Sequence, residues 1–258
     1  MTAASDLTIG VLLPDVLGTY SDSGNAVVLA QRARWRGIGA RVEHITAAAP
    51  PPTSCDIYLL GGGEDTAQGF AVDWLRRHPG LCRALAGPGL TFGVCAGLQI
   101  LGHTLTDLQG RRHDGVGLLD LSTSPGRRRI VGEVITRCVI PGVGLVTGFA
   151  NHRGATTLGP SARPLGRVVS GTGNDARSAR RDAVDGAVGE NVIGTYLHGP
   201  VLARNPALAD HLLERVTGVS FAGTGEPDVP DLPALRAGYL ARARRRLGGA
   251  PIAGGEGR

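Results

Sequence analysis

The residue most clearly placed to do chemistry is Cys95. It directly follows the apolar, strand-like run Leu90–Val94 and precedes a helix-like segment over residues 98–105. Gly93 and Gly97 flank the cysteine and allow the chain to reverse tightly. The pattern predicts a strand, a sharp turn and a helix, with a thiol at the turn. Helix N-terminal N–H groups favour a thiolate over a thiol. A cysteine placed in this way is a candidate nucleophile for acyl transfer.

A histidine is predicted to reach the same place from another strand. Residues 191–197 form a second strand-like run, and His198 follows it, with Gly199 leaving space around the ring. Parallel strands present their carboxyl ends at one edge of a sheet, so we expect His198 to act as the general base for Cys95. The other candidate base is His152, in a polar segment that we expect to be a loop. Its alternative role is a hydrogen bond that braces that loop.

The chain also offers backbone donors for an oxyanion. The N–H of Ala96 is expected to point toward the same space as the Cys95 sulfur. A second donor could come from Gly62 or Gly63, in the glycine run that ends the strand-like residues 55–60. Gln99, one helical turn after the cysteine, is placed to reach a bound substrate with its amide.

Composition limits the classes of protein. The 258 residues, 42% of them hydrophobic, suffice for one large domain. No apolar run reaches 18 residues, and residues 1–6 show no signal-peptide pattern, so we expect a cytoplasmic protein. The four cysteines lack metal-ligand spacing, which predicts a reducing compartment and no metal site. A formal charge of +5 with only 4% aromatic residues, and no nucleic-acid motif, argues against nucleic-acid binding.

Strand-like runs alternate with amphipathic helical segments, which predicts an α/β fold with a doubly wound, mostly parallel sheet flanked by helices. Residues 116–169 are strand-rich and predict a mixed or antiparallel extension. We expect a domain over residues 1–220, a linker over 221–233, a basic C-terminal helix over 234–247 and a disordered tail over 248–258. The strands are expected at 7–13, 41–45, 57–60, 90–94 and 191–197, and the helices at 26–36, 67–77 and 206–216.

Several segments together resemble the class I glutamine amidotransferases, and within them the cobyric-acid-synthase-like branch and its GatD family. The resemblance covers about residues 7–217. In the segment Gly148-Phe-Ala-Asn-His-Arg-Gly154, Ala150 stands where the family usually has Glu. The segments that carry the likeness are the cysteine turn over residues 93–99, Tyr20-Ser-Asp-Ser-Gly-Asn25, Gly61-Gly-Gly-Glu-Asp65, residues 148–154 and Gly194-Thr-Tyr-Leu-His-Gly-Pro200.

The resemblance implies a glutaminase subunit that hydrolyses L-glutamine and delivers ammonia to an ATP-dependent MurT-type ligase, its partner in a heterodimer, for amidation of the D-glutamate of lipid II. It also implies that Arg129 binds the substrate, and a guanidinium suits the α-carboxylate of glutamine. Arg127 or Arg128 could be the true ligand by a register slip. The chain has no phosphate-binding glycine loop, so we expect no cofactor of its own, with ATP and metal on the ligase.

The orientation of His198 is less well explained by the sequence. Most class I amidotransferases have Glu two residues after this histidine, and here that position is Pro200. A histidine base without an acceptor on its second nitrogen is poorly oriented. We therefore expect the partner ligase to supply an acidic residue, with Asp107 or Asp210 as the internal alternatives.

Three other functions remain open at this point. The chain could be a cysteine-dependent α/β hydrolase of the DJ-1/PfpI type, which would release no ammonia from glutamine. It could be an interaction subunit whose Cys–His pair is inactive. It could also serve another acceptor, such as a cobyrinate-like acid, although an enzyme of that kind usually carries its own synthetase domain.

Overall fold

The computed structural model describes residues 6–18, 22–175, 182–221, 237–238 and 241. The chain divides into two compact units, Met1–Phe221 and Ala222–Arg258. Of the second unit only residues 237, 238 and 241 are described, and all three are helical. The predicted C-terminal helix lies mostly, and the predicted tail entirely, outside the described residues.

The elements of the first unit are mixed strands and helices up to α4, in the order β1-α1-β2-β3-α2-α3-β4-α4, and are then mainly strands. The described strands are β1 Leu7–Leu12, β2 Ala40–Ile45, β3 Ile57–Leu60, β4 Leu90–Val94, β5 Thr104–Thr106, β6 Arg112–Asp114, β7 Leu121–Cys138, β8 Leu145–Leu158, β9 Gly166–Ser170, β10 Val184–Asp185, β11 Ala187–Val188, β12 Val192–Thr195 and β13 Leu197–His198. The described helices are α1 Gly24–Trp35, α2 Asp65–Arg76, α3 Pro79–Leu85, α4 Ala96–Ile100, α5 Val201–Arg204 and α6 Pro206–Thr217.

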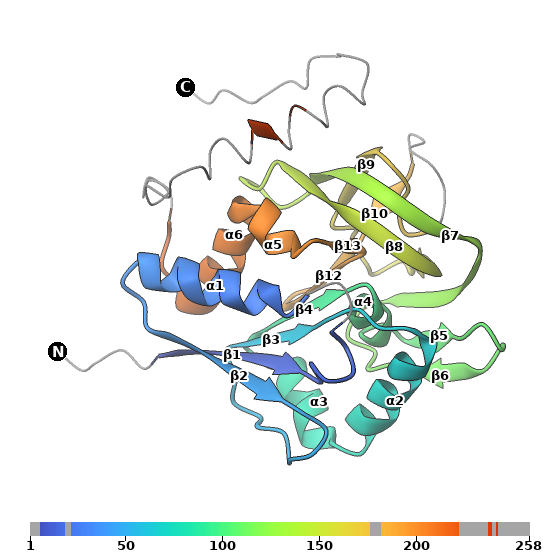
Figure 1. Cartoon of the computed structure of the whole chain (residues 1–258), viewed down its shortest axis with the longest axis horizontal. Coiled ribbons are helices and arrows are strands. Elements are labelled where there is room, and N and C mark those ends of the chain that lie inside the picture. Colours follow the sequence, from blue (N-terminus) through green and yellow to red (C-terminus); the bar gives the residue numbers. More distant parts are fainter. Residues whose placement is uncertain (1–5, 19–21, 176–181, 222–236, 239–240, 242–258) are drawn as a thin grey trace. The chain divides into compact units, whose positions relative to one another are not determined.

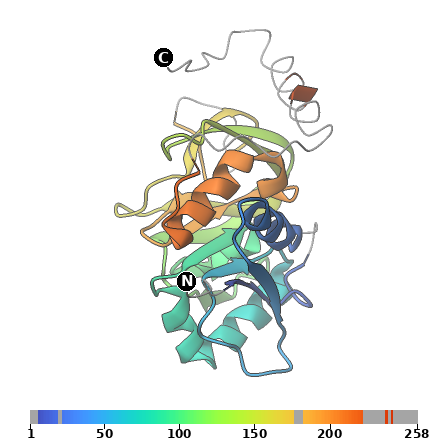
Figure 2. The same ribbon diagram turned by 90° about the vertical axis from the view of Figure 1, so that its left-hand side faces the viewer.

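The first sheet has the strand order β11-β12-β4-β3-β1-β2, and every neighbouring pair is parallel except β11 with β12. Every residue of β1, β3 and β4 is buried, because helices cover both faces of the sheet. Helices α1 and α6 lie on one face, and α2 and α3 lie on the other (Figures 1 and 2). The predicted doubly wound, mostly parallel sheet is confirmed.

The second sheet is built around the long pair β7 and β8, which run antiparallel, and it also contains β5, β6, β9, β10 and β13. This pair confirms the predicted strand-rich extension over residues 116–169. The register of the pair shifts once. Pro125 pairs with Gly154 and Ile130 pairs with His152, so residues 126–129 of β7 face only Arg153 of β8.

Two predicted elements differ in the structure. The helix expected over residues 98–105 ends at Ile100, and Thr104–Thr106 is a strand that pairs with β7 and β6. Pairing with these strands therefore overrides local helix propensity. The strand expected over residues 191–197 is divided at Tyr196. Residues before it pair with β4 in the first sheet, and Leu197–His198 pairs with β8 in the second.

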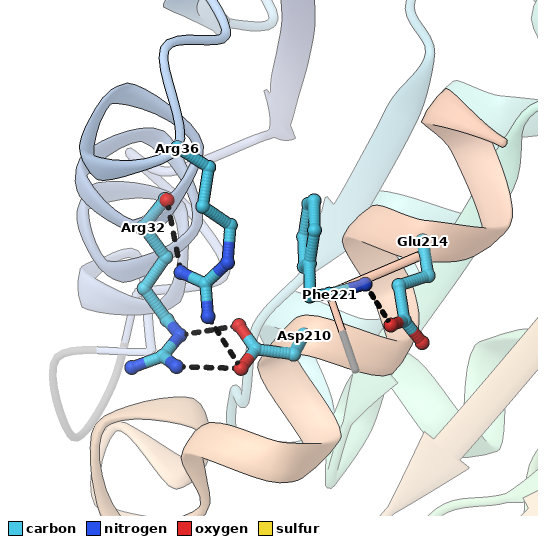
Figure 3. Close-up of polar contacts among 5 residues, drawn as sticks. All are labelled: Arg32, Arg36, Asp210, Glu214 and Phe221. Carbon is cyan, nitrogen blue, oxygen red and sulfur yellow. Dashed lines mark hydrogen bonds and ion pairs between the residues drawn. The ribbon is translucent and has the colours of Figure 1, made fainter. Parts of the chain in front are cut away.

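Helices α1 and α6 are joined by an ionic cluster (Figure 3). Arg32 donates to both carboxylate oxygens of Asp210, at 2.7 and 2.6 Å, and Arg36 donates to one of them at 2.8 Å. The Arg36 guanidinium also lies 4.5 Å from the ring centre of Phe221, whose backbone N–H donates to Glu214. Phe221 falls in the segment expected to be a linker, but it is buried against the first unit, so that unit extends through it.

Candidate active site

The turn that carries Cys95 is held between two strands of the first sheet. The backbone N–H of Cys95 donates to the Thr195 carbonyl at 2.8 Å, and that of Gly97 donates to the Gly61 carbonyl at 3.1 Å. Cys95 has φ 53° and ψ −101°, a conformation that side-chain-bearing residues rarely adopt. Such a strained turn between a strand and a helix exposes a nucleophile at the edge of an α/β sheet.

His198 is oriented from within the chain. Its Nδ1 lies 2.9 Å from Oδ2 and 3.1 Å from Oδ1 of Asp22, in the loop between β1 and α1. Both side chains are 1% exposed. A carboxylate can only accept, so Nδ1 carries the proton, and Nε2 of the neutral ring keeps the lone pair that a general base needs.

Gly62 lies where these side chains come together. A Cβ atom on Gly62 would lie 2.8 Å from Cε1 of His198, 3.0 Å from Oδ2 of Asp22 and 3.6 Å from Cβ of Cys95. The three side chains thus converge on one glycine, which must lack a side chain for them to do so.

The prediction that the chain lacks an acceptor for His198 is therefore wrong. Neither internal alternative has that role: Asp107 accepts from Arg111 at 2.7 Å, and Asp210 is paired with Arg32 and Arg36. The sequence did contain a usable signal. Asp22 follows β1 at the same sheet edge as Cys95, and a carboxylate there is a candidate partner for a histidine that arrives at that edge.

The backbone donors are also partly reassigned. The N–H of Gly62 donates to Oδ2 of Asp22 at 2.9 Å, so it is committed to that carboxylate and the assignment of Gly62 to an oxyanion hole is wrong. The N–H of Ala96 is directed at the Cys95 sulfur and acts to lower its pKa. Ala96 and Gly63 stay as predicted donors, and Gly63 lines the pocket in front of the thiol.

Cys95 is a protonated thiol at neutral pH. Burial raises its pKa to about 12, and the negative charges of Asp22 and Glu64 add to the effect, whereas the Ala96 N–H and Arg129 oppose it. The expected thiolate is thus not present before reaction, because α4 has only five residues and its N-terminus does not outweigh burial. A nearby base has to remove the proton.

A pocket of about 130 Å³ opens in front of Cys95. His198 is buried and is not one of the described residues that line this pocket. The wall consists of Gly63, Glu64, Asp65, Gln68, Cys95, Gln99, Thr106, Leu108, Thr123, Pro125, Arg129, Asn151, His152, Arg153 and Gly154.

Arg129 reaches this pocket, whereas Arg127 and Arg128 do not line it. Its Nε donates to Oδ1 of Asn151 at 2.7 Å, and one terminal nitrogen donates to Glu64 at 3.1 Å. Arg129 is the last residue of the β7 segment that faces Arg153 alone. Such irregularities re-aim side chains, which explains how one arginine of three is directed to the site.

Gln99 lies at the inner end of the pocket, 4% exposed. Its amide nitrogen donates to the Tyr196 hydroxyl at 2.9 Å, and that hydroxyl is 2.6 Å from Oγ1 of Thr156, which is 2.7 Å from Oγ1 of Thr123. This buried chain of polar groups fixes the Gln99 side chain. Its contact with a substrate stays a prediction.

We expected His152 to lie in a loop, but this is wrong. It lies within β8, where it is 3% exposed. Its Nδ1 lies 2.8 Å from the Gly154 carbonyl, and its ring stacks on Tyr196 with ring centres 3.7 Å apart. Burial lowers its pKa to about 4, so the ring is neutral at pH 7. The bracing hydrogen bond considered for His152 is present.

Within the described ranges, no group of three or more His, Cys, Asp or Glu side chains is arranged to hold a metal ion. Over the same residues, no helix is both long enough and apolar enough to cross a bilayer.

An oriented imidazole and a buried thiol at the edge of a doubly wound sheet form the arrangement expected of a cysteine-dependent α/β enzyme. Comparison with known families specifies the class further. The CobB/CobQ-like glutamine amidotransferase domain matches residues 8–206, and the chain belongs to this family.

Three curated relatives are similar over most of the chain. The lipid II isoglutaminyl synthase (glutamine-hydrolyzing) subunit GatD of Staphylococcus aureus (strain N315) is 36% identical over 81% of this chain and 84% of its own length. The subunit of the same name from Streptococcus pneumoniae (strain ATCC BAA-255 / R6) is 30% identical over 80% and 79%. Cobyric acid synthase of Sphingopyxis alaskensis (strain DSM 13593 / LMG 18877 / RB2256) is 31% identical over 76% of this chain but only 38% of its own length.

The raised pKa of Cys95 predicts how its alkylation depends on pH. Only the thiolate reacts with iodoacetamide, so the modification rate in the isolated chain should rise about tenfold per pH unit between pH 7 and 10. Mass spectrometry of the Cys95 peptide measures this rate. A rate already at its plateau at pH 7 would mean that the thiol is ionised and would contradict the assignment.

Proposed function

We propose that this chain is the glutamine-hydrolysing subunit of a two-protein amidotransferase, in which a MurT-type ligase uses the ammonia to amidate the D-glutamate of lipid II in the cytoplasm. Family membership and two relatives named GatD support this proposal. The observation that carries it is the convergence of Cys95, His198 and Asp22 on Gly62, with Cys95 lining a pocket.

The chemistry follows from these positions. Nε2 of His198 removes the Cys95 proton, and the sulfur attacks the carboxamide carbon of L-glutamine. The imidazolium then donates that proton to the departing nitrogen, ammonia leaves, and a thioester remains. Water, activated by the neutral His198, hydrolyses the thioester to glutamate. Asp22 keeps the proton on Nδ1 throughout and stabilises the imidazolium.

The remaining groups would hold the substrate. The N–H groups of Ala96 and Gly63 would stabilise the negative charge that develops on the carboxamide oxygen when the sulfur attacks the adjacent carbon. Arg129, 44% exposed at the mouth of the pocket, would bind the α-carboxylate of glutamine with its guanidinium. Gln99, at the inner end, would contact the carboxamide.

Ammonia produced here needs an acceptor activated elsewhere. The sequence has no phosphate-binding loop, so ATP and its metal ion are assigned to the ligase. A cobyrinate-like acceptor is the second candidate, because cobyric acid synthase is also a relative. The staphylococcal GatD subunit is 36% identical to this chain and cobyric acid synthase is 31% identical, which favours the GatD-type function.

The nucleophile provides the direct test of this function. Cys95→Ala should lower ammonia release from glutamine by at least about a thousandfold, because the covalent step is lost. The measurement is ammonia and glutamate production by the chain with and without its ligase, and Cys82→Ala, in α3, is the matched control. Wild-type protein that releases no ammonia in either setting would favour an inactive subunit or a hydrolase with another substrate.

Comparison of Arg129→Ala with Arg128→Ala distinguishes a role in substrate binding from a general effect of surface charge. Arg129→Ala should raise KM for glutamine about tenfold or more, because a charge-assisted pair to the α-carboxylate is lost in ground and transition states alike. Arg128→Ala removes the same charge from the same β7 segment without touching the pocket, so its constants should stay near wild type. Equal effects of the two substitutions would return Arg129 to the role of a surface charge.

A further inference from the structure

His152 has one ring nitrogen that nothing in the described part of the chain explains. Its Nδ1 faces the Gly154 carbonyl, which can only accept, so Nδ1 carries the proton. The other nitrogen, Nε2, is buried and has no hydrogen-bond partner among the described residues. A buried polar atom without a partner is costly, so it calls for a function.

The tautomer determines what Nε2 can do. The ring is neutral at pH 7, because burial holds the pKa of His152 to about 4, with the charges of His198 and Arg129 acting in the same direction. With the proton on Nδ1, Nε2 presents a lone pair and no hydrogen. Stacking on Tyr196 and the bond to Gly154 fix the plane of the ring, and His152 is one of the residues that line the pocket, so Nε2 is a rigid acceptor on a pocket residue.

The pocket has an inner and an outer end. At the outer end, Arg129 and Glu64 have side chains that are 44% and 67% exposed. At the inner end, Cys95, Gln99 and His152 are almost completely buried. A glutamine whose carboxamide reaches Cys95 therefore brings that carboxamide, and not its α-ammonium group, to the buried end where His152 lies.

We propose that Nε2 of His152 accepts an N–H of the substrate carboxamide and thereby distinguishes L-glutamine from L-glutamate. The inference rests on the proposed glutamine hydrolysis. The carboxamide nitrogen donates two hydrogen bonds, whereas the carboxylate of glutamate has only acceptor oxygens and would face the lone pair of Nε2. Sites that hydrogen-bond a substrate N–H reject analogues that lack it, since a buried group is then left unpaired. His152 is thus a specificity residue that also favours release of the product.

The test measures binding separately from turnover. In the full-length Cys95→Ala protein, calorimetry gives Kd values for L-glutamine and L-glutamate, and the same measurement is made with His152→Phe added. Phenylalanine keeps a ring against Tyr196 but has no acceptor. We expect the ratio of Kd for glutamate to Kd for glutamine to fall about tenfold or more, with thermal unfolding used to check the fold. His152→Gln, which places an amide oxygen near the position of Nε2, should restore part of the ratio.

A second measurement needs no substitution at His152. With 15N-labelled histidine in the Cys95→Ala protein, L-glutamine should move the Nε2 resonance of His152, whereas L-glutamate should not produce the same change. Glutamine binding with an unchanged Kd ratio in His152→Phe, or an Nε2 resonance that glutamine leaves unmoved, would overturn this inference and leave the proposed function standing. Absence of any glutamine binding to the Cys95→Ala protein would overturn both.

Discussion

The Asp22 carboxylate is the constraint on which the rest of the site depends. One of its oxygens accepts from Nδ1 of His198 and from the backbone N–H of Gly62. A single buried charge therefore connects the loop after β1, the glycine turn after β3 and the short strand β13. These three segments come from distant parts of the sequence, and Gly62 in turn lies against Cys95. Loss of this carboxylate would leave an unoriented base beside a thiol that stays protonated.

The two sheets contribute different parts of the site. The parallel sheet supplies the nucleophile turn, and the chain then leaves this sheet at Tyr196 so that β13 carries His198 to the second sheet. Buried Asp185 stabilises this change of sheet, accepting from Thr195 Oγ1 and from the Tyr196 N–H, and burial raises its pKa to about 6. The second sheet supplies Arg129 from β7 at the exposed end of the pocket and His152 from β8 at its buried end.

Local patterns in the sequence did not predict the break at Tyr196 that moves His198 into the second sheet, but they were sufficient for the parallel sheet and the cysteine turn. Each depends on apolar runs and small residues that act within a few positions. Asp22 lies in the segment over residues 20–25, but no local pattern assigns it a role, because its partner is 176 residues away and only the assembled sheet edge brings them together. The commitment of Gly62 to Asp22 and the raised pKa of Cys95 are also consequences of tertiary burial. Strand pairing ended α4 early, where local propensity predicted a longer helix.

Turnover by the isolated chain shows whether Asp22 orients His198 without help from another protein. We expect that the wild-type chain alone hydrolyses glutamine and that Asp22→Asn lowers kcat by about 10²- to 10⁴-fold, since asparagine no longer fixes the imidazole tautomer. Asp114→Asn, at an exposed pair with Arg76, is the control and should leave kcat unchanged. Turnover that appears only with the ligase, and that Asp22→Asn does not lower, would show that Asp22 does not orient His198 and would assign the orienting acid to the partner.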